Sequence, residues 1–170
     1  ANLVQVNADA INVGTITVLQ NSSEMVRNDM TFWSSPVANQ NVRNFSPETL
    51  VNRFWTYNES NDQFEQIFAA PNNLDPLNYN FENGKGVSIR VKNTLPTGQT
   101  FVHNGEFVGV PNNGLIEVNV QNQNQGYNLI GNPYASTINI EELLNLNPDV
   151  NSLYFWTHNY PVGSAQYSDN

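Results

Sequence analysis

The sequence predicts an all-β fold of the β-sandwich type, jelly-roll-like or related, with one short helix. Short apolar or alternating runs recur along the 170 residues and are separated by turn residues. The chain is rich in Asn, which favours turns and tolerates positive φ, while only 12% of its residues are charged. The Asn-Gly pairs at 104–105 and 113–114 lie between β-type runs and predict hairpin turns. Many short strands joined by tight turns are typical of sandwiches and barrels.

The predicted strands combine β-branched or aromatic residues with alternating or continuous apolar character. In chain order they are residues 3–6, 15–20, 30–37, 53–58, 63–68, 87–93, 100–110, 115–121, 127–131 and 153–159. Trp33 lies inside an apolar run and is expected in the core.

The helical signal is concentrated in STINIEELLNLNPD, residues 136–149. Ser136 or Asn139 is the candidate N-cap, and Glu141 and Glu142 supply negative charge to the first turn. A second, shorter helical turn is expected in SPETLVN, with Ser46 as its cap.

Two parts of the chain resemble each other and predict an internal pseudo-repeat. Pro36 falls on Pro133 at an offset of 97 residues, and FWTYN (54–58) falls on FWTHN (155–159) at an offset of 101. Each copy contains a strand, a Pro-containing break, a short helical segment and an aromatic strand. We therefore interpret both breaks as scaffold at the exit of a core strand.

The pseudo-repeat suggests a division of the chain. Residues 1–28 form N-terminal strands that continue an upstream module, and residues 29–126 are the first copy. Residues 127–170 are the truncated start of a second copy, packed with the first as a single domain. Because the second copy lacks later strands, an open edge or a neighbouring chain is expected beside residues 153–159.

The charge and composition exclude several classes of partner. Fifteen acidic residues against six basic ones give a formal net charge of −9, which repels phosphate backbones and argues against nucleic acid. The chain has no cysteine, and hence no disulfide, thiolate nucleophile or zinc site of the cysteine type. We expect no membrane insertion, because no apolar run approaches the length of a membrane span. Residues 1–20 do not resemble a signal peptide, so a signal for export is expected outside this sequence.

The sequence carries no catalytic motif, and we predict that the protein is not an enzyme. His103 and His158 are the two histidines, and neither has a supporting motif for a nucleophile and its base. Glu141 and Glu142 are explained by the helix N-terminus. We therefore expect no cofactor, and calcium is the one ion that the sequence leaves open.

Calcium is the ion that suits an acidic, Asn-rich surface. NESND, residues 58–62, is the densest group of oxygen ligands, although a solvated loop explains it as well. Lys85 or Lys92 could form a Lys–Asn crosslink of the adhesin type, and the alternative is a solvated lysine on an edge strand.

The aromatic strands carry the candidate binding residues. Alternation places Trp55 and Tyr57 on the face opposite Phe54, and it pairs Trp156 with His158 in the second copy. If the Phe face is core, these four side chains form an exposed platform of the kind that stacks on sugar rings. If the tryptophans fill the core, the platform does not exist. The sequence leaves both arrangements open.

Several strings of the sequence resemble a known bacterial module. They are LVQVNADAINVGTITV, FWSSPVANQNV, GKGVSIRVKNTLPTGQTFVHNGEFVGVPNNG, YNLIGNPYASTINIEELL and YFWTHN. Together they are similar to a β-rich module of large secreted and cell-surface proteins of Bacteroidota, which typically precedes a C-terminal sorting domain for type IX secretion.

The resemblance implies a secreted or cell-surface location. It favours a non-catalytic module that contributes to adhesion or to structural spacing, and the alternative is a carbohydrate-binding module of a secreted polysaccharide-degrading enzyme. The expected partners are a polysaccharide or another cell-surface ligand and the neighbouring domains of the same polypeptide.

Overall fold

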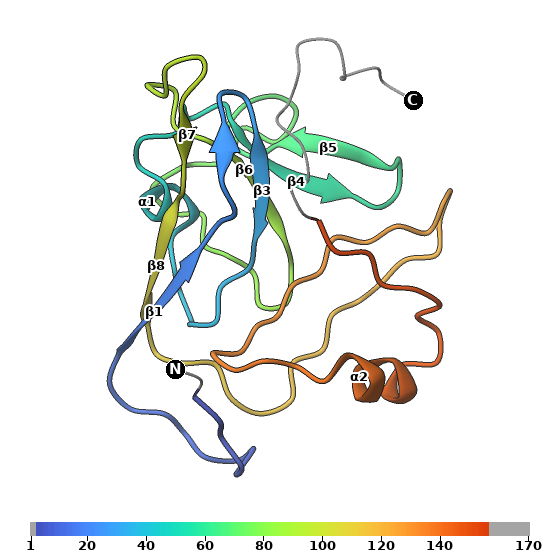
Figure 1. Ribbon diagram of the computed structural model, residues 1–170. Coiled ribbons are helices and arrows are strands. Elements are labelled where there is room, and N and C mark those ends of the chain that lie inside the picture. Colours follow the sequence, from blue (N-terminus) through green and yellow to red (C-terminus); the bar gives the residue numbers. More distant parts are fainter. Residues whose placement is uncertain (1–2, 157–170) are drawn as a thin grey trace.

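The computed structural model describes residues 3–156 and shows an all-β protein with two short helices in that range (Figure 1). The elements are β1 (Ile16–Asn21), β2 (Met25–Val26), β3 (Met30–Trp33), α1 (Val42–Phe45), β4 (Phe54–Asn58), β5 (Gln63–Gln66), β6 (Val87–Arg90), β7 (Thr100–Phe101), β8 (Asn104–Gly109) and α2 (Ile140–Leu146). No helix in the described part of the chain has the length and apolarity needed to cross a membrane.

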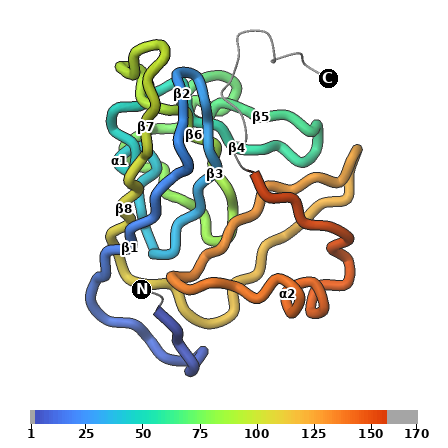
Figure 2. The backbone as a smooth tube through the Cα atoms, in the orientation of Figure 1, coloured from blue at the N-terminus to red at the C-terminus, as the bar shows by residue number. Residues whose placement is uncertain are grey.

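The strands form two antiparallel layers. One layer is a four-stranded sheet of order β3-β6-β4-β5. In the other, β1 pairs with β8 and β2 pairs with β7, both antiparallel. Because β2 follows β1 and β8 follows β7 along the chain, the two pairs together form one ribbon that is interrupted between them. Figures 1 and 2 show this ribbon beside the four-stranded sheet, with α1 next to it.

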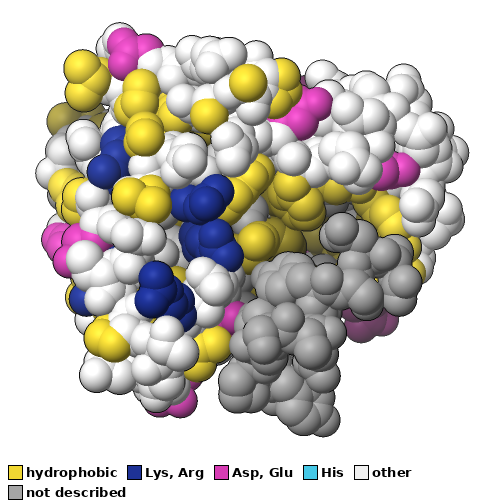
Figure 3. Space-filling model, turned by 90° about the horizontal axis from the view of Figure 1, so that it is seen from above, with side chains coloured by type: hydrophobic (Ala, Val, Ile, Leu, Met, Phe, Trp, Pro, Cys, Tyr) yellow, Lys and Arg dark blue, Asp and Glu magenta, His cyan; other side chains and the backbone are white. Residues whose placement is uncertain are grey.

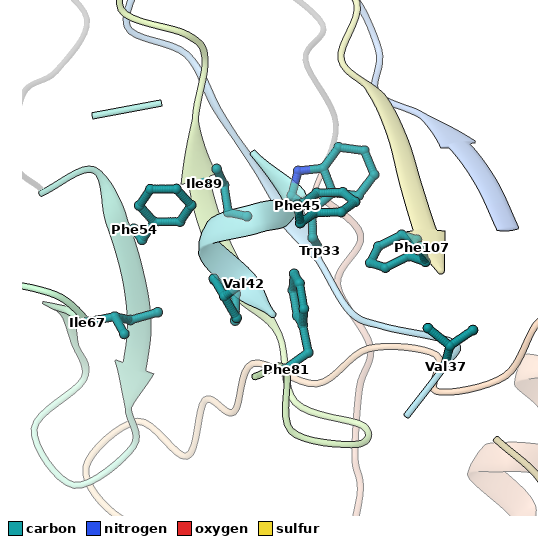
Figure 4. Close-up of a cluster of buried hydrophobic side chains, with 10 residues drawn as sticks. Trp33, Val37, Val42, Phe45, Phe54, Ile67, Phe81, Ile89 and Phe107 are labelled. Carbon is teal, nitrogen blue, oxygen red and sulfur yellow. The ribbon is translucent and has the colours of Figure 1, made fainter. Parts of the chain in front are cut away.

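The main core lies between the ribbon, the sheet and α1. Phe45 of α1 stacks on Phe107 of β8 with ring centroids 4.4 Å apart, and it meets Phe81 edge-on at 5.5 Å. From the four-stranded sheet, Trp33 and Phe54 enter the same core (Figure 4). The expectation that Trp33 is a core residue is confirmed. Burial of these large aromatic side chains is the main favourable term for this fold.

Six of the ten predicted runs contain strands, but four form no strand within the described residues: 3–6, 115–121, 127–131 and 153–156. In residues 115–121, the side chain of Val118 lies directly against Gly84, where a Cβ would clash with Val118 Cγ2. The aromatic run at 153–159 lies partly outside the described residues. The open edge that the sequence predicts beside it therefore stays a prediction.

The predicted strand at 127–131 is reduced to a single bridge between Ile130 and Lys85. Gly86 N donates to Leu129 O at 3.0 Å, and Gly131 N donates to Gly84 O at 3.0 Å. A Cβ at Gly86 would lie 2.6 Å from Leu129 Cγ, so this close approach requires glycine.

The predicted hairpin turn at Asn104-Gly105 is wrong. Both residues lie inside β8, where they pair with Asn21 and Gln20 of β1. The chain does not reverse there because β7 and β8 run in one direction along the same ribbon. Gly114 does have a positive φ of +76°, as the turn prediction at 113–114 requires, but no strand follows it in the described part of the chain.

The main helix agrees with the sequence, whereas the shorter one is displaced. The Asn139 side chain accepts hydrogen bonds from Glu141 N and Glu142 N, as expected of an N-cap. The α1 helix instead begins after Asn41, and Ser46 lies at its C-cap rather than its N-cap. Asn41 is the N-cap of α1, since its side chain accepts from Asn44 N, and Val42 and Phe45 of the helix are buried in the core.

The two Pro-containing breaks meet at one buried side chain, that of Asn112, which is 8% exposed. Its backbone N donates to Pro36 O at 3.0 Å, and its Nδ2 donates to Pro133 O at 2.9 Å and to Ser35 O at 3.3 Å. A buried amide that satisfies three carbonyl groups has a structural role. The pseudo-repeat and the division of the chain at residues 28 and 126 stay a prediction.

Candidate functional site

The burial of Phe54 decides which face of the four-stranded sheet is open. Phe54 pairs with Ile89 and is 0% exposed, and Ile89 is buried with it. Side chains alternate along a strand, so Trp55 and Tyr57 lie on the opposite face. Of the two arrangements that the sequence left open, β4 shows the one in which the Phe face is core.

We call this opposite surface the outer face. Strand register places on it the side chains of Met30, Phe32, Trp55, Tyr57, Phe64, Gln66, Ser88 and Arg90. Phe32, Ser88, Trp55 and Gln66 form one row across all four strands. Ser88 is fully buried although it belongs to this face, because larger side chains surround it.

Four aromatic rings of the outer face, those of Trp156, Phe32, Phe64 and Tyr57, touch one another in a continuous row. Trp156 lies 5.1 Å from Phe32, Phe32 stacks on Phe64 at 5.7 Å, and Phe64 meets Tyr57 edge-on at 5.1 Å. Trp156 and Phe64 remain 54% and 44% exposed, and Trp55 and Tyr57 are half-buried. Flat rings that are fixed by neighbours and open on one side are suited to stacking on the apolar face of a sugar.

Trp156 belongs to this face although it lies in no strand. Its indole Nε1 donates to Met30 O at 3.3 Å, 126 positions earlier in the chain. The structure therefore brings together three of the four predicted residues, Trp55, Tyr57 and Trp156. The fourth, His158, lies outside the described residues.

Asp62 lies at the end of the row that Tyr57 forms. The Tyr57 hydroxyl donates to Asp62 Oδ1 at 3.0 Å, and Asp62 Oδ2 accepts from Gln125 N at 3.0 Å. Burial, followed by the hydrogen bond and negative charge of Asp62, raises the pKa of Tyr57 to about 12. The hydroxyl is therefore protonated and fixed in direction at neutral pH.

His103 is a packing residue in this structure. It lies between β7 and β8, with ring centroids 5.4 Å from Trp33 and 5.1 Å from Phe45. Burial lowers its pKa below 6.5, against the opposing effects of the Phe45 backbone and the charge of Glu48. A neutral imidazole among aromatic rings fits the absence of a motif around it.

The oxygen-rich loop at 58–62 is held by its own contacts. Glu59 Oε1 lies 2.7 Å from Lys85 Nζ, and Asp62 is bound to Tyr57 as described. Lys92 Nζ lies 3.6 Å from Glu48, so both lysines considered for a crosslink form ion pairs. Within residues 3–156, no group of three or more His, Asp or Glu side chains could hold a metal ion.

Sequence reasoning missed Phe32 and Phe64 as members of the site. Both lie in runs predicted as strands, and Phe32 alternates with the core residue Trp33. Alternation could therefore have placed Phe32 opposite Trp33, but no local pattern shows that its ring meets that of Phe64, which lies on β5 at the other edge of the sheet.

The fold and this face define an all-β domain with an aromatic, partly open sheet surface. The whole chain, residues 1–170, matches the model of a family described as Domain of unknown function (DUF8693), and the chain belongs to this family. Searches of curated proteins and of solved structures found no match.

Proposed function

We propose that this domain is a non-catalytic binding module that contributes to adhesion by binding a saccharide on its outer face. The observation that carries the proposal is the complete burial of Phe54, which leaves Trp55 and Tyr57 on the open side of the sheet. The contacts from Trp156 through Phe32 and Phe64 to Tyr57 support it, because they hold the rings in place before any ligand binds.

The resemblance to the module of Bacteroidota surface proteins supports a secreted or cell-surface location. In that setting the ligand is a polysaccharide or another surface glycan. The same face would serve a carbohydrate-binding module attached to a secreted polysaccharide-degrading enzyme, so the two versions differ in the neighbouring domains and not in this surface.

Structural spacing is the second candidate, and one observation favours it. Asn113 Nδ2 donates to Asn7 O at 2.8 Å and to Ala10 O at 2.9 Å, and Asn12 Nδ2 donates to Pro111 O at 2.8 Å. These bonds fasten the N-terminal segment to residues about a hundred positions away, which suits a domain that transmits force between neighbours.

Affinity electrophoresis in gels that contain soluble plant and algal polysaccharides tests the binding proposal. The wild type is expected to be retarded with micromolar to millimolar affinity, which is about −8 to −4 kcal/mol. Trp55→Ala should lose most of the retardation, because a ring contact supplies about 1 kcal/mol beyond the area it buries.

Tyr154→Ala is the matched control. Tyr154 is exposed and aromatic, and its ring contacts that of Tyr127 rather than a ring of the row. Equal loss in both variants, or no retardation of the wild type by any polysaccharide, would leave structural spacing as the function. Circular dichroism verifies that each variant is folded.

A further inference from the structure

A cavity lies between β1 and β3, and we call it the edge cleft. Its volume is about 340 Å³, and it is lined by residues 18–20, residues 32–34 and residues of the segment 130–137. β2 and β3 are joined by a tight turn, in which Asp29 N donates to Val26 O at 3.0 Å. Away from this turn β1 and β3 are not paired with each other, and the edge cleft lies between them (Figure 1).

The β1 wall of the edge cleft is an open strand edge. Ser22 N donates to His103 O at 2.9 Å, directly beyond the paired ends of β1 and β8. In an antiparallel ladder every second residue directs its N–H and C=O groups at the partner strand, so the even-numbered residues of β1 bond to β8. Thr17 and Leu19 therefore direct their backbone groups away from β8, and Leu19 lines the cleft.

The β3 wall is an open edge as well. Asp29 O accepts from Val91 N at 2.9 Å, which fixes the alternation so that Thr31 and Trp33 bond to β6. Phe32 therefore directs its N–H and C=O groups away from the four-stranded sheet, and it lines the cleft. No backbone hydrogen bond joins β1 to β3 in the described part of the chain. Two open strand edges beside one cavity are a template for a further strand.

The edge cleft contains a polar atom that lacks a partner, and it carries no charge. Ser34 Oγ is buried without a hydrogen-bond partner among the described residues, beside Gly131 of the cleft wall. No lining residue is charged in this protein of net charge −9, whereas Figure 3 shows Lys and Arg side chains gathered on the face seen from above. These features fit an uncharged extended peptide, whose backbone supplies both donors and acceptors.

The chain itself contains such a peptide in residues 3–14, which we call the N-terminal arm. The three most exposed large hydrophobic side chains among the described residues belong to it, namely Val6, Val13 and Ile11 at 97%, 95% and 90%. Residues 3–6 have the sequence LVQV, which is uncharged and strand-like in pattern, yet they form no strand in one copy of the protein. Apolar side chains gathered in the open in this way mark an interaction surface.

The N-terminal arm is held where a second copy can receive it. Asn113 Nδ2 donates to Asn7 O and Ala10 O, so the arm is ordered before association, which lowers the entropic cost of binding. Leu3 N donates to Ala135 O at 3.0 Å, and Ala135 lines the edge cleft. The arm thus starts at the border of its own cleft, and a two-fold axis at this border brings the arm of each copy to the cleft of the other.

We propose that the protein forms a symmetric dimer in which residues 3–6 of each copy enter the edge cleft of the other and pair with the open edges of β1 and β3. The inserted strand joins the ribbon to the four-stranded sheet and covers apolar side chains of the arm. The dimer does not depend on saccharide binding, because it uses strand edges and not the outer face.

Sedimentation equilibrium of the full chain over a range of concentrations tests the dimer. We expect a monomer–dimer equilibrium with a dissociation constant on the order of 10 μM. Val6→Asp and Leu19→Asp should each raise this constant at least about tenfold, because each places a charge in an apolar, uncharged interface. Both side chains are exposed in one copy, at 97% and 74%, so these substitutions leave its core intact.

Leu77→Asp is the matched control. Leu77 is 81% exposed, and it belongs neither to the N-terminal arm nor to the lining of the edge cleft. The variant has the same net charge as the other two, and it should dimerise as the wild type does. Circular dichroism verifies that all three variants are folded.

Engineered cysteines identify the two segments that meet. The chain has no cysteine, so a Val4→Cys protein and a Leu19→Cys protein carry one thiol each. Mixed under mild oxidation, they should form a disulfide-linked heterodimer that mass spectrometry and a non-reducing gel detect. A mixture of the Val4→Cys and Leu77→Cys proteins is the control and should give far less heterodimer.

Three results would overturn the proposed dimer. One is a monomer at every concentration, and another is a dimer that Val6→Asp and Leu19→Asp weaken no more than Leu77→Asp does. The third is a chain with cysteines at both positions 4 and 19 that closes its disulfide within one copy at every dilution, since the arm would then occupy its own cleft. Retardation by polysaccharides is measured separately, so either proposal can fail without the other.

Discussion

The tripeptide Phe-Trp-Thr occurs twice in this chain, and its two copies lie in different settings. In β4, Phe54 is fully buried in the main core, while Trp55 is half-buried on the outer face. In the second copy, Phe155 is 72% exposed and belongs to no strand. Both tryptophans nevertheless reach the outer face, Trp55 by strand register and Trp156 by contact with Phe32.

The comparison shows that neighbouring strands determine whether the phenylalanine of such a string is buried. Phe54 is buried because β4 has β6 on one side and β5 on the other, with core residues beneath. Phe155 has no paired strand among the described residues. The predictions below test this difference, beginning with the largest expected effect.

Replacing the two phenylalanines should give very different losses of stability. Phe54→Ala removes a fully buried ring and is expected to lower the free energy of unfolding by about 3–5 kcal/mol. Phe155→Ala should change it by less than about 0.5 kcal/mol, because the side chain is exposed. Urea unfolding followed by tryptophan fluorescence measures both.

Phe54→Leu serves if Phe54→Ala does not fold, with an expected loss of about 1–2 kcal/mol. Comparable losses at positions 54 and 155 would contradict the distinction between the two copies.

The second prediction concerns Asn112, the buried residue at which the two Pro-containing breaks meet. Asn112→Ala should cost about 1–3 kcal/mol, because Pro133 O and Ser35 O lose a buried donor. Asn113→Ala is the control, since Asn113 also donates to backbone carbonyls but is less buried. Thermal unfolding of the two variants should show the larger fall in Tm for Asn112. An equal fall would remove the special position of this junction.

The third prediction concerns Tyr57, which the second string replaces with His158. Its folded-state pKa of about 12 lies above the ordinary value of 10, so the folded state holds this proton more tightly than the unfolded state does. The resulting stability is complete below pH 10 and is lost as the pH rises from 10 toward 12. Tm should therefore fall more steeply over this range in the wild type than in Tyr57→Phe. Parallel curves would show that the folded state does not hold the Tyr57 proton more tightly than the unfolded state does.

The last prediction concerns the second tryptophan, whose replacement should change stability little. Trp156→Ala should lower the free energy of unfolding by less than about 1 kcal/mol, since the side chain is more than half exposed. It should nevertheless weaken binding of the saccharide that Trp55→Ala affects, because both residues belong to the outer face. A variant that binds normally would restrict the site to the rings on the strands.

The sequence by itself determined the all-β class, most of the strands and the main helix with its Asn139 cap. These features follow from local rules, namely alternation, turn residues and capping, which act within a few positions of each other. The same rules grouped Trp55 with Tyr57, since that grouping needs only the two-residue period of a strand.

The tertiary structure alone decided which side of β4 is core. Alternation separates Phe54 from Trp55 but is symmetric between the two faces, and only the packing of α1, β8 and Phe81 against one face breaks that symmetry. Non-local contact also overrode local signals. It kept Asn104 and Gly105 inside β8 and left residues 115–121 without a strand partner.

The outer face shows the same limit at the level of a site. Phe32, Phe64 and Trp156 come from distant parts of the chain. β3 and β5 are the two edge strands of the sheet, yet the rings of Phe32 and Phe64 meet over its outer face, and Trp156 reaches Phe32 from outside the strands. A pattern read along the chain specifies which side chains share a strand face. Which strands become neighbours depends on the free energy of burying one face of the whole sheet, and no local pattern contains that quantity.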